Sequence, residues 1–155
     1  MRMSAKNHSV LHLFQCDHCF LCAFVVGGFV DENALSRVIV DSAITVHRTL
    51  GGPGLLESIY EEALVWELQQ RRLSVARQCY IPIAYKGQQP ASPLRLDILV
   101  EKLVIIEVKS TVEYNPIFEA QTLTYLRLTN LKLGMIINFG ERYVRDGIHR
   151  VVNRL

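Results

Sequence analysis

The sequence predicts an α/β fold in which a mixed sheet is flanked by helices, and three observations lead to this prediction. Two segments with helical periodicity come first, then three strand-like segments, a further helix and a last strand. Glycine and proline clusters at residues 51–54 and 87–90 separate them. With 155 residues, half of them apolar and 21% charged, the chain suits one globular domain with its own core. Hairpins combined with one crossover helix favour a sandwich over a doubly wound sheet.

Two helices open the regular part of the sequence. Apolar residues recur at helical spacing from Leu35 to Leu50, with Asp31 or Asn33 as the N-cap. The glycines and Pro53 of residues 51–54 end this helix, and a second helix runs from about residue 55 to 72. The apolar positions of the second helix are Leu56, Ile59, Ala63, Leu64, Trp66 and Leu68.

Strands follow the helices. The segment from Val75 to Lys86 reads as a strand in which Pro82 indicates an edge position or a bulge. Two further strands are expected at about residues 94–100 and 103–110. Asn115 and Pro116 then begin a helix that ends near residue 129, and residues 131–139 form a buried-looking strand. A short strand or helix at residues 147–152 closes the domain.

Charged residues interrupt the two strands that otherwise look most buried. Asp97 lies in the first of them, and Glu107 and Lys109 lie in the second. Burial of a carboxylate or an ammonium is costly unless the group is paired or binds a metal. Two carboxylates and a lysine in this setting therefore indicate metal-dependent phosphodiester chemistry.

The geometry of a hairpin makes a demand on these residues. Glu107 and Lys109 are two positions apart, so they project from the same face of a strand. A two-residue loop at residues 101–102 would set Asp97 opposite Ile106 and remove it from that face. A three-residue loop or one β-bulge would set Asp97 opposite Glu107. The catalytic interpretation therefore predicts an odd number of residues between the two paired strands.

With that geometry, Asp97 and Glu107 supply hard oxygen ligands for Mg²⁺ or Mn²⁺, and the Val108 carbonyl is a further candidate ligand. Lys109 would orient or help deprotonate the attacking water and stabilise charge on the phosphate. The alternative is a surface aspartate and an exposed Glu–Lys pair. Leu99, Leu103 and Ile105 share the face by alternation, which argues against a purely solvated face.

Five other residues are ambiguous from the sequence alone. Glu57 and Tyr60 share one face of the second helix, and Gln121 and Tyr125 share one face of the third. Each pair is equally consistent with ordinary helix residues, as is His47 at the end of the first helix.

Together these residues resemble the PD-(D/E)xK nuclease superfamily, and more closely its small bacterial branch, the GxxExxY proteins. Residues 54–60 match the naming motif of the branch, Asp97 with residues 107–109 matches D…ExK, and residues 121–125 match the QxxxY element of RecB-like exonucleases. Residues 46–51, 116–121 and 131–134 continue the similarity, which covers the chain from about Glu32 to its end.

The resemblance implies a restriction-endonuclease-like αβββαβ core over residues 31–155 and a Mg²⁺- or Mn²⁺-dependent nuclease. The cysteine content, which does not suggest a secreted disulfide scaffold, separately favours a cytoplasmic location. The resemblance also implies that Glu57 is an acidic residue near the metal, that Gln121 and Tyr125 position DNA or the lysine, and that Tyr60 and His47 are further substrate-positioning candidates. Two features depart from the pattern: Leu96 stands where the superfamily has proline, and Gly51–Gly52 lengthens the turn before Glu57.

The first thirty residues have a different character and lie outside this similarity. Cys16, Cys19 and Cys22 have the spacing of zinc or iron–sulfur ligands, with His12 or His18 as a fourth ligand. The apolar run at residues 19–30 is shorter than the ~20 residues that span a bilayer. We expect a disordered extension or a start codon assigned too early, rather than a signal peptide. Cys79 is expected to be a small buried side chain in a reducing compartment.

Several alternatives remain open at this stage. A net charge of +2 neither indicates nor excludes nucleic-acid binding. The leading hypothesis is a nuclease acting on DNA, with no membrane association and with a homodimer or a separate targeting partner as options. The alternatives are a catalytically silent module that binds nucleic acid or a partner, and a metal-sensing or redox protein built on the N-terminal cysteines. DNA versus RNA and endo- versus exonuclease action are not determined by the sequence.

Overall fold

The computed structural model describes residues 31–84, 86–88 and 93–153. In chain order the elements are α1 (Glu32–Thr49), α2 (Glu57–Gln70), β1 (Val75–Ile81), β2 (Leu94–Val100), β3 (Val104–Lys109), α3 (Ile117–Thr129), β4 (Leu133–Asn138), the 3-10 turn η1 (Val144–Gly147) and β5 (Ile148–Val152). None of the helices in these residues is both long and apolar enough to cross a bilayer.

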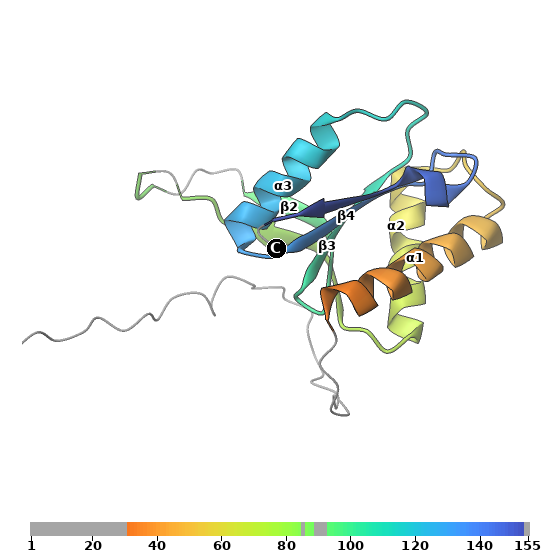
Figure 1. Ribbon diagram of the computed structural model, residues 1–155, viewed down its shortest axis with the longest axis horizontal. Helices are drawn as coiled ribbons and strands as arrows, with labels where there is room; N and C mark the ends of the chain where they lie inside the picture. The colour runs from red at the N-terminus through yellow and green to blue at the C-terminus, as the bar shows by residue number, and fades with distance from the viewer. Residues whose placement is uncertain (1–30, 85, 89–92, 154–155) are drawn as a thin grey trace, which may run out of the picture.

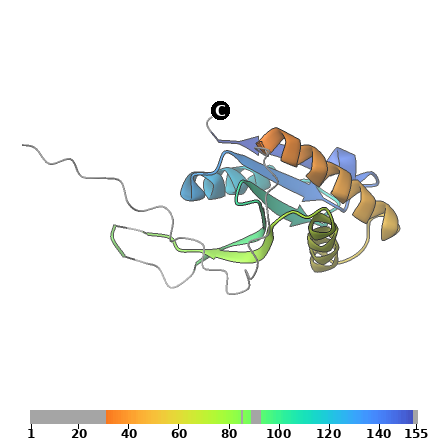
Figure 2. The same ribbon diagram turned by 90° about the horizontal axis from the view of Figure 1, so that it is seen from below.

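The five strands form one mixed sheet in the order β1-β2-β3-β4-β5 (Figure 1). Strands β3 and β4 are parallel and α3 connects them, whereas the other neighbouring strands are antiparallel. Helices α1 and α2 pack on one face of the sheet and α3 on the other, as the two views of the ribbon show (Figures 1 and 2). The predicted fold class is confirmed, and β5 is the closing element.

Each face of the sheet has its own buried cluster. The α1/α2 side buries residues such as Leu35, Leu64, Ile98 and Ile106, and the α3 side buries Leu99, Ile105 and Leu126. Leu99 and Ile105 are at most 2% exposed, so the sheet face next to Asp97 and Glu107 is not a solvated one. Leu103 differs from expectation, because in the hairpin turn it packs against the α1/α2 cluster.

The ends of the first two helices follow from local chemistry. Asp31 caps α1 by accepting a hydrogen bond from the Ala34 N–H, as one of the two expected caps. Helix α2 begins two residues later than expected, because the preceding turn continues to Leu56. In that turn Gly54 has a φ of +112°, which only glycine adopts without strain.

Helix α2 and strand β1 each add a detail that the sequence pattern does not contain. Leu56, Ile59 and Trp66 are exposed to 72%, 39% and 60%, because α2 turns the face of Tyr60, Leu64 and Leu68 towards the sheet. The strand expected to reach residue 86 ends at Ile81, directly before Pro82, which cannot donate to a ladder. Strand β1 is an edge strand, which is one of the two alternatives that Pro82 indicated.

The β2–β3 hairpin has the geometry that the catalytic interpretation requires. Val100 pairs with Val104, which leaves a loop of three residues, 101–103. Glu101 and Lys102 both have positive φ, and the Leu103 N–H donates to the Val100 carbonyl, so Leu103 is the extra residue beside a tight turn. Ile98 pairs with Ile106, and one step further this register sets Asp97 opposite Glu107.

Hydrogen bonds from the Asn138 side chain connect the end of β4 to the segment that follows β3. Its side-chain oxygen accepts hydrogen bonds from the Thr111 and Gly140 N–H groups, and its amide donates to the Thr111 carbonyl. Asn138 is fully buried, and a Cβ at Gly140 would lie 2.3 Å from the Thr111 oxygen. The chain after Lys109 is therefore held against the end of β4.

We expect Asn138→Ala to lower the free energy of unfolding by about 2–3 kcal/mol, because two partly buried N–H groups and one carbonyl lose their partner. Urea denaturation measures this change. Gln69→Ala, an exposed substitution on α2, should stay within about 0.5 kcal/mol of the wild type. An unchanged midpoint for Asn138→Ala would contradict this role.

Candidate active site

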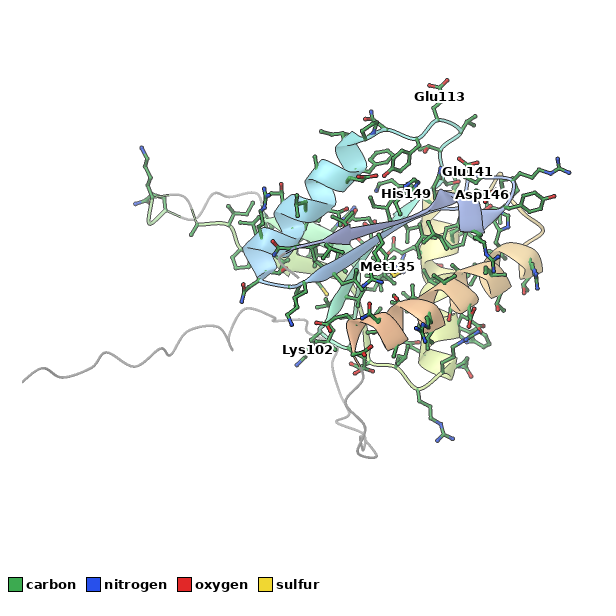
Figure 3. All side chains as sticks on the ribbon, in the orientation of Figure 1. Lys102, Glu113, Met135, Glu141, Asp146 and His149 are labelled. Atoms are coloured by element: carbon green, nitrogen blue, oxygen red, sulfur yellow. The ribbon has the colours of Figure 1, made fainter. Side chains whose placement is uncertain are left out.

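Four charged side chains from three elements meet at the carboxyl end of β3. The Lys109 Nζ lies 3.6 Å from a Glu107 oxygen, 3.8 Å from a Glu57 oxygen and 3.9 Å from an Asp97 oxygen. In Figure 3 Lys102, in the hairpin turn before β3, and Glu113, beyond the end of β3, lie at opposite ends of the molecule. The site thus lies at the end of the sheet away from the hairpin turn.

Asp97 is held in place by the neighbouring strand. Its Oδ2 accepts a hydrogen bond from the Val108 N–H at 3.0 Å, at the level where the regular β2–β3 pairing has ended. The Val108 N–H thus donates to the Asp97 side chain instead of to a backbone carbonyl of the neighbouring strand. This bond keeps the Asp97 carboxylate beside β3 while the two strands part.

Glu107 is the most buried member of the group. It is 4% exposed, and its Oε1 is buried with no hydrogen-bond partner. Burial, together with the neighbouring Asp97 charge, raises the pKa of Glu107 to about 8. A buried acceptor without a partner is uncommon in folded proteins and favours a cation or donor at this position.

The other two carboxylates are also perturbed. Burial raises the pKa of Asp97, against the opposing effect of its bond to the Val108 N–H. Burial likewise raises the pKa of Glu57, and the Lys109 charge opposes the shift. All three shifts have the same direction because three acidic groups share one ammonium in a partly dry site.

Gln121 and Tyr125 lie together on α3, beside this group. The Gln121 side-chain amide donates to the Tyr125 hydroxyl. Burial and the Glu107 charge raise the pKa of Tyr125, which indicates that the hydroxyl lies within electrostatic reach of Glu107.

Tyr60 and His47 do not join the charged group. Tyr60 is fully buried, stacks on Phe139 with ring centroids 4.6 Å apart, and donates from its hydroxyl to the Gly52 carbonyl. His47 is also buried, with its Nε2 3.1 Å from the Glu141 carbonyl. Both rings pack beneath the loops around the site, because they lie on the core-facing sides of their helices.

Val108 contributes its N–H to Asp97, and its side chain is buried in the cluster on the α1/α2 side. Within the described ranges, no three His, Cys, Asp or Glu side chains are arranged as a set of metal ligands. The three carboxylates surround the lysine instead. The carboxylate oxygens of the site, including the Glu107 Oε1 that has no hydrogen-bond partner, are hard ligands that suit a divalent cation.

Glu61 is a residue of this region that the sequence analysis did not identify. It is buried one helical turn after Glu57, and its Oε1 lies 2.6 Å from both the Arg77 Nε and the Gln78 Nε2. Its charge contributes to the raised pKa of Asp97. The i, i+4 spacing of the two glutamates on α2 was the available signal.

Gln78 marks an irregularity in β1 at the same level of the sheet. It has a φ of +54° inside the strand, and its neighbours Arg77 and Cys79 pair with Ile98 and Leu96, which sets Gln78 beside Asp97. Irregular strand positions of this kind are frequent next to active sites.

Comparison with models of protein families identifies the superfamily of the chain. Residues 33–151 match the family model described as the PD-(D/E)XK nuclease superfamily. The chain belongs to this superfamily. No curated protein and no solved structure matches it significantly. PD-(D/E)XK nucleases generally use divalent metals and act on nucleic acids, and the mixed sheet with its flanking helices is consistent with their restriction-endonuclease-like fold.

The cysteine predictions have different outcomes. Cys79 is buried in β1, as expected. Cys16, Cys19 and Cys22, and with them the expectations about residues 1–30, lie outside the described residues.

The raised pKa of Glu107 predicts how stability depends on pH in the absence of divalent metal. Between about pH 4.5 and about pH 8 the unfolded state releases a proton that folded Glu107 retains, so the free energy of unfolding falls as the pH rises. We expect Glu107→Gln to match the wild type near pH 5 and to exceed it by about 1–3 kcal/mol at pH 9.

Urea denaturation in a metal chelator at both pH values measures this difference. Glu113→Gln, the same substitution at an exposed position, should follow the wild type throughout. Parallel pH profiles for Glu107→Gln and the wild type would contradict the shift.

Proposed function

We propose that this chain is a divalent-metal-dependent nuclease of the GxxExxY branch that hydrolyses DNA phosphodiester bonds at the Asp97–Glu107–Lys109 site. The observation that carries the proposal is the convergence of three carboxylates within 4 Å of the Lys109 ammonium, one of them with a buried oxygen that lacks a partner.

The charge balance of the site supports a second cation. Lys109 is the only cationic side chain within ion-pair distance of these three carboxylates among the described residues. Burying carboxylates costs free energy unless positive charge and hydrogen bonds offset it. A divalent ion beside Asp97 and Glu107 would supply that charge and favour their ionised forms.

Asp97 and Glu107 would hold the metal, with Glu57 and the Val108 carbonyl as further candidate ligands. Mg²⁺ or Mn²⁺ bound there would supply Lewis-acid polarisation of the scissile phosphate. Lys109 would orient the attacking water and stabilise negative charge that develops on the phosphate oxygens. Gln121 and Tyr125 would position the substrate or the lysine from α3.

The reaction is a hydrolysis and needs no other reactant. The oxygen of water forms a bond to phosphorus, the bond from phosphorus to one deoxyribose oxygen breaks, and a proton from the water passes to the leaving oxygen. Glu57, whose side chain is 45% exposed, is the acidic group most accessible to an incoming substrate. The match of residues 54–60 to the branch motif supports the proposal that Glu57 is a further candidate metal ligand.

We expect the purified protein to cleave DNA with Mg²⁺ or Mn²⁺, and Lys109→Ala to lower the rate by about 100-fold or more, because a preorganised charge at the reacting phosphate is lost. A panel of linear, circular, single-stranded and double-stranded DNA and RNA measures the activity and defines the substrate. Lys132→Ala removes the charge of an exposed lysine at the opposite end of the sheet and should retain full activity.

Absence of cleavage on every substrate of this panel would refute the catalytic proposal. If DNA still binds, in a salt-dependent manner that Glu107→Gln does not affect, the chain is instead a silent binding module on the same fold.

Cation binding gives a test that is independent of cleavage. We expect Asp97→Ala to weaken Mn²⁺ binding by at least ~10-fold, as measured by electron paramagnetic resonance, because an oxygen ligand is lost. Calorimetry at pH 7 should also show proton release on binding, since Glu107, with a pKa of about 8, must ionise. Asp41→Ala, on the exposed side of α1, is the matched control. Identical Mn²⁺ affinities for Asp97→Ala and the wild type would contradict the metal assignment.

A further inference from the structure

The Lys109 ammonium has an aromatic neighbour in addition to its three carboxylates. Its Nζ lies 5.6 Å from the centre of the Phe118 ring, within the range of a cation–π interaction. Phe118 comes from α3, whereas the carboxylates come from α2, β2 and β3. The lysine is therefore contacted from both layers of helices and from the sheet.

Phe118 belongs to the same stripe of α3 as Gln121 and Tyr125. Positions 118, 121 and 125 follow the i, i+3, i+7 spacing that aligns side chains on one helix face. The helix therefore presents a phenyl ring, an amide and a phenol in succession towards the charged group. Phe118 extends the QxxxY element by one helical turn.

The Phe118 ring is itself held by a small cluster at the start of α3. Tyr114 packs against it nearly edge-on, with centroids 5.7 Å apart and an interplanar angle of 82°. The Tyr114 hydroxyl donates to Glu119 at 3.0 Å, and its ring stacks on His149 of β5 at 3.9 Å. The His149 Nδ1 lies 3.8 Å from Glu119.

We propose that Phe118 is a positioning residue that holds the Lys109 ammonium against the carboxylates of the site. The three N···O distances, 3.6–3.9 Å, are longer than the ~2.7–2.9 Å of a charge-assisted hydrogen bond, so none of the carboxylates fixes the ammonium by a short bond. Lysine has a long flexible stem. The ring face attracts the cation and covers it on the remaining side.

An aliphatic residue of similar size would fill the space but would not attract the charge. Phe118→Leu separates these two contributions, and Phe118→Tyr keeps an aromatic face. Ile117→Ala, one residue earlier and 57% exposed, reports any general effect of substitution at this helix start.

The position of the lysine can be measured without any assay of cleavage. Aromatic rings shift the proton resonances of groups above their faces, so the Lys109 side-chain methylene protons should be shifted upfield in protein with isotope-labelled lysine. Lys109→Ala identifies these signals. We expect the shift to disappear in Phe118→Leu and to persist in Phe118→Tyr and Ile117→Ala, with circular dichroism spectra unchanged in all three.

The consequence for turnover rests on the proposed nuclease function. With saturating Mg²⁺ and DNA we expect Phe118→Leu to lower kcat by about 3- to 30-fold, the range that corresponds to loss of a cation–π contact. Its KM and its Mn²⁺ affinity should stay near those of the wild type, and Phe118→Tyr should restore kcat.

The two measurements distinguish the two proposals. If the wild type cleaves no substrate, the nuclease assignment fails while the Lys109 resonances still decide whether Phe118 positions the lysine. Unshifted Lys109 signals in the wild type, or the same shift in Phe118→Leu, would overturn the positioning role. A wild-type kcat for Phe118→Leu in an active enzyme would also overturn it.

Discussion

The pairing register of the β2–β3 hairpin is the constraint on which the site depends. Successive residues of a strand point to opposite faces, so a shift by one residue would move the Asp97 carboxylate into the apolar cluster beneath α1 and α2. The three-residue loop prevents this shift. Ser74 stabilises the loop from outside, because its carbonyl accepts from the Glu101 N–H and its own N–H donates to the Glu101 carboxylate at 2.6 Å.

The register brings acidic groups together, and burial then determines their behaviour. The exposed fraction of the side chain rises from 6% for Glu107, through 14% for Asp97, to 45% for Glu57. The deepest carboxylate has the largest pKa shift because it has lost the most water and because the Asp97 charge also raises its pKa. Of the three carboxylates, Glu57 is therefore the one that solvent, and an ion arriving from solvent, meets first.

The sequence was informative wherever a local rule determined the geometry. The odd number of residues in the hairpin loop followed from Asp97 and Glu107 having to share a face. Asp31 was one of two candidates for the cap of α1, and an edge strand was one of two alternatives at Pro82. The sequence was less informative where tertiary contacts determine which side chains lie in the site. Tyr60 and His47 looked like site residues, but helix periodicity alone does not show which side chains the loops will cover. Glu61 was missed because its role depends on Arg77 and Gln78, which only the packing of α2 against β1 brings near.

The three motif residues of the segment 54–60 have different roles: Gly54 and Tyr60 shape the turn, and Glu57 contributes a charge to the site. Gly54 permits the turn, and the Tyr60 hydroxyl closes it by donating to the Gly52 carbonyl at 2.7 Å and accepting from the Leu55 N–H at 3.2 Å. The hydroxyl of Ser110, the residue after Lys109, donates to the Leu55 carbonyl, which joins this turn to the end of β3. The tyrosine thus acts through the backbone rather than at the reacting atoms. The turn it closes leads directly into α2, and so fixes the helix start that carries Glu57 towards the lysine.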